Sequence, residues 1–218
     1  MSIVAPVRPS AVAVACGGKT FSIGERGSPV SPRADKLAGM TTELDVLKRV
    51  SEGLSSQGLL FMLTGSFALA YYATPRMTRD LDIVVALAAA DVDALLGTFS
   101  SDFYIDADTV RAALRDERLF NLMHLRSGIK VDLIVRKSSE YRLTEFARRQ
   151  RVTLGSVVTW IVSREDLILS KLVWSLDSGS ELQLRDVRQL LAAPLDVDYL
   201  QRWAPVLGVQ MRLCELMR

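Results

Sequence analysis

The sequence predicts an α/β (α+β) fold, in which a mixed β-sheet with flanking helices is followed by a helical C-terminal region. Two observations support this prediction. Up to about residue 162, short apolar runs bounded by glycine alternate with stretches whose apolar residues recur every three or four positions. From Ser163 onward the spacing is helical throughout, with interruptions at Pro194 and Pro205. A chain of 218 residues is long enough for one domain and a small helical region.

Three regions follow from these patterns. Residues 1–40 contain scattered glycine, serine and proline without periodicity, and we predict a disordered arm there. Residues 41–162 hold the predicted sheet, and residues 163–218 form the C-terminal helical region. The arm carries a net charge of +3, so the remaining residues carry −1 of the total of +2. This balance argues against a protein that binds nucleic acid by bulk positive charge, and any such binding would depend on local clusters.

Each predicted element has a local cause. The first helix, residues 42–56, has apolar side chains at helical spacing from Leu44 to Leu54 and is followed by Gly58. Gly128 and Gly155 sit between pairs of apolar runs, and glycine readily adopts the positive φ of tight hairpin turns. The predicted strands are 59–64, 81–86, 119–125, 129–135, 151–154 and 157–162. The further helices are 66–73, 88–99, 138–150, 163–176, 182–192, 197–203 and 206–217.

The candidate chemistry begins with Asp80 and Asp82, separated by one residue at the start of a strand. Side chains at i and i+2 of a strand point to the same face, so the two carboxylates lie side by side. Such a pair repels unless a cation bridges it, and hard oxygen ligands suit Mg²⁺. Asp132 interrupts the apolar strand 129–135. If that strand lies beside 81–86, three carboxylates converge and two Mg²⁺ ions become possible, although Asp132 alone could pair with Lys130 or Arg136.

A phosphate site is predicted at the turn before the aspartates. Gly65 and Ser66 join a strand to a helix, where glycine allows close approach of a ligand and the helix N-terminus offers free N–H groups. Arg76 and Arg79 precede the aspartates and are available for phosphate or for carboxylate pairing. The sequence therefore predicts an NTP-binding site that combines Gly65, Ser66 and Arg76.

These residues together resemble a known superfamily. The motifs Gly65-Ser66-x-Ala68, Arg76-x-Thr78-x-Asp80-x-Asp82 and Val131-Asp132-Leu133 are similar to those of the DNA polymerase β-like nucleotidyltransferases. The arginine–threonine lead-in looks like that of the minimal and AbiEii-type members, some of which are toxins of toxin–antitoxin pairs. The later motifs Ser163-x-Glu165-Asp166-Leu167, Lys171-Leu172 and Arg185-Asp186 extend the resemblance, with Arg-Asp where Lys-Asp is more usual.

The resemblance implies a function and roles for the residues. Residues 41–162 become a catalytic domain that transfers a nucleoside monophosphate from an NTP to the hydroxyl of RNA, tRNA or a protein. A toxin role, with an antitoxin as the candidate partner, is also implied. Asp80, Asp82 and Asp132 would bind Mg²⁺, and Lys171 and Asp186 would serve the nucleotide site. Lys171 could also be a surface residue paired with Glu165 or Asp166, and Asp186 could pair with a neighbouring arginine. The alternatives are an antibiotic-type, small-molecule nucleotidyltransferase and a non-catalytic toxin–antitoxin partner.

Other features receive simpler interpretations. His124 is predicted to be structural or partly exposed, and Trp160, Trp174 and Trp203 are predicted to pack in the core. The body has one basic cluster, which is either a solvated face or a contact for an RNA backbone: Arg136, Lys137, Arg142, Arg148, Arg149 and Arg151. No window is long and apolar enough for a membrane span. Together with the absence of a signal peptide, and of a disulfide framework at Cys16 and Cys214, this predicts a cytoplasmic protein.

Overall fold

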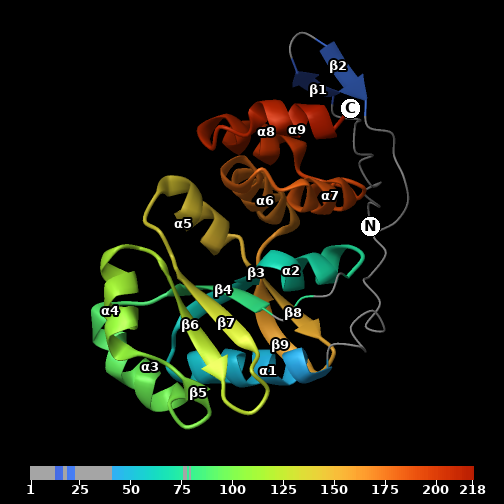
Figure 1. Cartoon of the computed structure of the whole chain (residues 1–218). Helices are drawn as coiled ribbons and strands as arrows, with labels where there is room; N and C mark the ends of the chain where they lie inside the picture. Colours follow the sequence, from blue (N-terminus) through green and yellow to red (C-terminus); the bar gives the residue numbers. More distant parts are fainter. Residues whose placement is uncertain (1–12, 17–18, 23–40, 76–77, 79) are drawn as a thin grey trace, which may run out of the picture.

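The computed structural model describes residues 13–16, 19–22, 41–75, 78 and 80–218, and its architecture confirms the predicted fold class (Figure 1). A seven-stranded mixed sheet has the order β5-β6-β7-β4-β3-β9-β8. Its strands are β3 (Leu60–Thr64), β4 (Asp80–Ala86), β5 (Phe103–Tyr104), β6 (Leu119–His124), β7 (Lys130–Val135), β8 (Gln150–Leu154) and β9 (Val157–Ile161). Two further strands, β1 (Ala13–Cys16) and β2 (Lys19–Ser22), pair with each other within the N-terminal region.

Helices cover both sides of the sheet. Figure 1 shows α1, α3 and α4 on one side and α5 and α6 on the other, with α7 to α9 stacked beyond α6. The helices of the first half are α1 (Thr41–Ser56), α2 (Gly65–Tyr72), η2 (Ala89–Asp91), α3 (Val92–Phe99), α4 (Ala107–Arg115) and α5 (Glu140–Ala147). The C-terminal helices are α6 (Arg164–Ser178), α7 (Glu181–Leu190), α8 (Val197–Val206) and α9 (Gln210–Leu216).

Most predicted elements are confirmed, and the differences have physical reasons. Both hairpins form, with Gly128 and Gly155 at positive φ. Strand β5 and helix α4 have no predicted counterpart, because α4 is short and buries only Val110 and Ala113. The predicted break at Pro205 is wrong. That proline lies inside the last turn of α8, which continues to Val206.

Strand alternation determines what faces the two sides of the central strands. In β4, Leu81, Ile83 and Val85 are fully buried, whereas the aspartates and Val84 face the other side. β7 alternates in the same way. Burying each aliphatic side chain contributes about 1.5–3 kcal/mol, which fixes the register of both strands and with it the direction of the intervening polar residues.

The C-terminal helices are held to the body by a polar network at the start of α6. Ser163 caps the helix by accepting a hydrogen bond from the backbone N–H of Asp166. The buried Asp166 carboxylate also accepts hydrogen bonds from Arg148 and from Tyr199 of α8. Cys214 in α9 is disulfide-bonded, contrary to the expectation of no disulfide. In the described part of the chain, no helix has both the length and the apolar character that a membrane crossing requires.

Candidate active site

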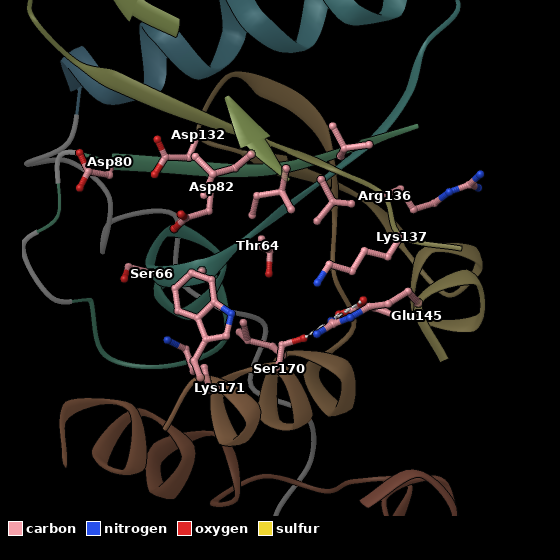
Figure 2. A pocket seen from close by; sticks show the side chains of 18 of the residues that line it. Thr64, Ser66, Asp80, Asp82, Asp132, Arg136, Lys137, Glu145, Ser170 and Lys171 are labelled. Atoms are coloured by element: carbon pink, nitrogen blue, oxygen red, sulfur yellow. Dashed lines mark hydrogen bonds and ion pairs between the residues drawn. The ribbon is translucent and has the colours of Figure 1, made fainter. Parts of the chain in front are cut away.

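The pairing of β4 with β7 brings the three predicted aspartates together. These strands are parallel, and Asp82 lies directly opposite Asp132 in their register. Residues at the same level of neighbouring strands project from the same face, and Asp80 shares that face with Asp82. All three carboxylates line one pocket, where Figure 2 shows them grouped at one side.

Burial and repulsion perturb the central carboxylate. The pKa of Asp82 is raised from 3.8 to about 6, first by burial and then by the neighbouring charges of Asp132 and Asp80. Asp132 is held by hydrogen bonds and charge, because the amide of Asn121 donates to one carboxylate oxygen and Lys130 Nζ lies 3.1 Å from the other. The concentrated negative charge at this end of the pocket is the kind of environment that a divalent cation stabilises.

The donor chemistry of the three carboxylates fits Mg²⁺. Oxygen ligands from one or two carboxylates, completed by substrate phosphates, are typical for this ion. Among the residues that the structure describes, no group of three or more acidic, histidine or cysteine side chains is already arranged as a metal cage. The Asp132 carboxylate is held in its position by a hydrogen bond from Asn121 and an ion pair with Lys130.

Gly65 makes room for Asp82, a role that the sequence analysis does not predict. Thr64 at the end of β3 lies opposite Asp82 in the antiparallel pair with β4. The next residue, Gly65, has φ +65°, and a Cβ built there would lie 1.9 Å from Asp82 Oδ2. Any side chain at this position would therefore both strain the backbone and displace the carboxylate.

The predicted phosphate site adjoins the aspartates. Ser66 is buried in the first turn of α2, and its side chain and Gly65 line the same pocket as the carboxylates. Arg76, the predicted arginine of this site, lies outside the described residues. The structure thus brings two of the three predicted phosphate-binding residues next to the carboxylates.

Lys171 reaches the pocket wall from α6, and Asp186 of α7 lies behind it. Lys171 Nζ is 2.8 Å from Asp186 Oδ2 and 3.1 Å from Gln183 Oε1. Both members of the ion pair are almost fully buried, at 4% and 1% exposure. Lys171 and Gln183 line the pocket, whereas Asp186 does not. Lys171 is buried, so it is not the surface residue of the alternative interpretation, and its partners include Asp186 and Gln183.

The opposite end of the pocket contains residues that the sequence analysis did not assign. The buried carboxylate of Glu145 accepts hydrogen bonds from Arg142, at 2.8 and 3.0 Å, and from Ser170, at 2.7 Å (Figure 2). The pKa of Glu145 is raised by burial, against the opposing effect of Arg142. Arg142 and Glu145 are three positions apart on α5, whereas Ser170 of α6 meets them only through tertiary packing that no sequence spacing indicates.

The whole pocket has a volume of about 700 Å³, large enough for a nucleotide and part of an acceptor. Its middle section is apolar, with Val84, Ile134 and Leu167. Trp174 also lines it, and the predicted core packing is wrong for this residue, which is 45% exposed. Trp203 is buried as predicted.

Comparison with known proteins bears on the fold. No protein-family model and no curated protein matches the sequence. Among solved structures, an antigenic nucleotidyltransferase-like protein from Paracoccidioides brasiliensis is similar over 81% of this chain and 93% of its own. Its TM-score is 0.52 and its sequence identity is 19%. The chain has a nucleotidyltransferase fold.

A second solved nucleotidyltransferase-fold structure supports the same conclusion. The antibiotic-resistance factor ANT(2″)-Ia is similar over 80% of this chain and 96% of its own, with a TM-score of 0.52 and 9% identity. At such low identities the similarity establishes the nucleotidyltransferase fold. The reaction and its substrates depend on which side chains occupy the pocket.

The predicted basic cluster divides into residues that pair with a carboxylate and residues that have no such partner in the described part of the chain. Arg142 pairs with Glu145, and Arg148 pairs with Glu165 and Asp166. Arg136 and Lys137 line the pocket. His124 is partly exposed, as predicted, and its Nδ1 is hydrogen-bonded to Ser127.

Proposed function

We propose that this chain is an Mg²⁺-dependent nucleotidyltransferase that transfers a nucleoside monophosphate from an NTP to the hydroxyl of RNA, tRNA or a protein. The alignment of Asp80, Asp82 and Asp132 on one face of β4 and β7 is the observation that carries the proposal. Three carboxylates beside a glycine–serine turn form a site for a metal-bound triphosphate. The nucleotidyltransferase fold is consistent with this use of the site.

The proposed reaction forms one P–O bond and breaks another. The acceptor oxygen attacks the α-phosphorus of the NTP, and the bond from that phosphorus to the β-phosphate oxygen breaks, releasing pyrophosphate. We assign Asp132 the role of receiving the hydroxyl proton, which its position opposite Asp82 at the same level of the sheet supports. Bound Mg²⁺ would neutralise the charge that develops on the phosphate oxygens.

The remaining pocket residues position the nucleotide. Gly65 and Ser66 present backbone and hydroxyl groups to the triphosphate, in the way that helix N-termini bind anions. Asp186 acts through Lys171, because its carboxylate fixes the ammonium group at the pocket wall. We divide the protein accordingly into a catalytic domain, residues 41–162, and a helical region, residues 163–218, that closes the pocket from the side of α6.

The AbiEii-like motif from Ser163 to Asp186 supports a macromolecular acceptor and the role of a toxin in a toxin–antitoxin pair. The similarity in fold to an antibiotic-resistance factor supports a small-molecule acceptor. This support is limited, because one fold can serve many substrates. A non-catalytic binding partner is the third candidate, and the retention of all three carboxylates argues against it.

Label transfer tests the proposal. Each NTP, radiolabelled at the α-phosphate, is incubated with Mg²⁺ and the protein together with total RNA or total protein. The control is the Asp80→Asn, Asp82→Asn double variant. Label in RNA or in protein that disappears in the variant would support the proposal and identify the acceptor class.

A thermal-shift measurement separates the alternatives if neither fraction is labelled. A ligand that binds only the folded protein raises its melting temperature. Stabilisation by an NTP with Mg²⁺ would then favour a small-molecule acceptor. The absence of a shift with every NTP, in well-folded protein, would contradict nucleotide binding and favour the non-catalytic partner. Trp174 gives an independent signal, because its half-exposed indole lines the pocket and should change its fluorescence when a nucleotide enters.

A further inference from the structure

The pocket contains cations whose charges are compensated to different degrees. Arg142 is paired with Glu145 at 2.8 Å, and Lys171 is paired with Asp186 at 2.8 Å. Lys130, beside the pocket, is paired with Asp132 at 3.1 Å. These three positive charges are each matched by a carboxylate in the folded protein, so each gains less from binding a further anion.

Lys137 differs from all of them. It follows the end of β7, is exposed and lines the pocket. Figure 2 shows its amine directed into the cavity, toward the space between the carboxylates and Ser170. Within the described ranges of the chain, no hydrogen bond or ion pair involves its side chain. Lys137 is therefore a pocket cation that is available to a ligand.

Two arginines, Arg136 and Arg149, add further positive charge to that of Lys137. Arg136 lies over the Phe146 ring at 5.3 Å, and Arg149 lies over the same ring at 4.7 Å. The buried Nε atoms of both arginines have no hydrogen-bond partner among the described residues. The pKa of Arg149 is lowered by burial and by the nearby charge of Arg136. The pocket lining also includes Glu117 and Arg118, whose charges offset each other, and Glu145, whose charge is matched by Arg142. The charges of Arg136 and Lys137 therefore leave this end of the pocket net positive.

The distance between Lys137 and the three carboxylates limits which part of a ligand the lysine can contact. Asp132, Ile134 and Arg136 face the same side of β7, which places the Cα atoms of Asp132 and Arg136 roughly 13 Å apart at the usual rise of a strand. Lys137 reaches back from beyond Arg136 into the cavity. A ligand in this pocket thus meets carboxylates at one end and a lysine amine at the other.

We propose that Lys137, supported by the charges of Arg136 and Arg149, is the phosphate-binding cation of this pocket. The proposal rests on the proposed function, in which every substrate combination carries phosphate. The phosphate belongs either to the triphosphate of the NTP or to the backbone of an acceptor RNA strand. Lys171, whose charge is already matched by Asp186, helps to position the nucleotide from the pocket wall but gains less than Lys137 from binding a phosphate. A polycationic acceptor would be repelled from this end.

Binding measurements without catalysis test the proposal. The variants are Lys137→Ala, Lys137→Arg to restore the charge, and Lys48→Ala as a control at an exposed lysine on α1. One arm measures the thermal shift given by inorganic tripolyphosphate with Mg²⁺. The other measures fluorescence anisotropy of a labelled single-stranded RNA without NTP, across a series of salt concentrations.

We expect Lys137→Ala to weaken one ligand about tenfold, which corresponds to about 1.4 kcal/mol, while Lys137→Arg and Lys48→Ala stay near wild type. Weaker tripolyphosphate binding would assign Lys137 to the nucleotide. Weaker RNA binding, with the salt slope smaller by about 0.7, would assign it to the acceptor backbone.

Three results would overturn the proposal, and they differ from one another. If wild type binds Mg²⁺ with ATP and Lys137→Ala binds both probes equally well, the role of Lys137 is wrong and the proposed function stands. If wild type binds neither ATP nor either probe, both the proposed function and the role of Lys137 are wrong. A loss in Lys48→Ala equal to that in Lys137→Ala would show that only overall charge matters, which also contradicts a specific site.

Discussion

Replacing Gly65 with alanine should damage the pocket far more than it damages the fold. Gly65 has φ +65°, a conformation that costs a residue with a Cβ roughly 1–2 kcal/mol. The added Cβ would also lie 1.9 Å from Oδ2 and 2.9 Å from Cβ of Asp82. Because the aspartate side chain is short, it must rotate away from its position, at about 0.5–1.5 kcal/mol if it leaves its preferred rotamer. The free energy of unfolding should therefore fall by roughly 1.5–3.5 kcal/mol.

Gly179→Ala is a matched control. Gly179 follows α6 with φ +62°, and a Cβ there would have no neighbour within 4 Å. The free energy of unfolding of Gly179→Ala should fall only by the cost of the positive φ, roughly 1–2 kcal/mol. For a chain of this size, each kcal/mol of lost stability lowers the melting temperature by about 2–4 °C. We therefore expect both variants to remain folded at room temperature.

Urea unfolding and Mg²⁺-dependent ATP binding, measured on both variants, separate stability from function. We expect Gly179→Ala to bind ATP like wild type. Gly65→Ala should bind at least tenfold more weakly, since Asp82 has left the metal site. Equal ATP affinity in the two variants would refute the dependence of the carboxylate site on Gly65.

Three further predictions concern individual charges and caps. In metal-free protein, Asp82 holds its proton more tightly in the folded state, with a pKa of about 6 rather than 3.8, so its protonation stabilises the fold at low pH. This contribution is lost as the pH rises from about 4 to 6. Asp82→Asn should therefore be more stable than wild type by up to about 3 kcal/mol at pH 7, and about as stable as wild type at pH 4. Chemical denaturation in the presence of EDTA would measure both values. Glu145→Ala leaves Arg142 without its carboxylate and should cost roughly 3 kcal/mol, whereas Glu145→Gln, which keeps one acceptor oxygen for Arg142 and Ser170 and loses the second, should cost less in the same assay. Ser163→Ala removes the cap of α6 and should lower the free energy of unfolding by about 1 kcal/mol, and an unchanged value would mean that Asp166 and its other partners hold this helix end alone.

Much of the fold was predictable because its signals are local. The alternation in β4 and β7 and the glycines of the two hairpins each depend on a few consecutive residues. The candidate site was partly predictable for the same reason, since Asp80 and Asp82 share a face by strand geometry alone. The partnership of Asp82 with Asp132 needed the parallel pairing of β4 and β7, which the sequence allowed but did not specify.

The rest of the pocket depends on contacts between distant segments. Gly65 must be glycine because β3 and β4 pair in a register that places Asp82 beside it. Glu145 meets Ser170 across 25 positions in the sequence, and Lys171 meets Asp186 across 15. Trp174 has helical spacing that fits a core residue, yet it lines the pocket. No single window of sequence contains these relationships, so propensity and periodicity could not reveal them.

The distribution of paired and unpaired charges gives the pocket a direction. Its carboxylate end gains from a cation, because Asp82 is buried beside two further carboxylates. Its far end gains from an anion, because Lys137 points into the cavity and the guanidinium groups of Arg136 and Arg149 both lie over the Phe146 ring. The Arg142–Glu145 pair at the far end and the Lys171–Asp186 pair at the wall formed by α6 and α7 are each charge-matched, so they contribute little net charge. A substrate complex with its metal-bound phosphates at the carboxylates and a further phosphate group extending to Lys137 would satisfy both ends at once, whereas the reverse orientation would leave the carboxylates without a cation. The same side chains that bind the substrates would thus also select their orientation.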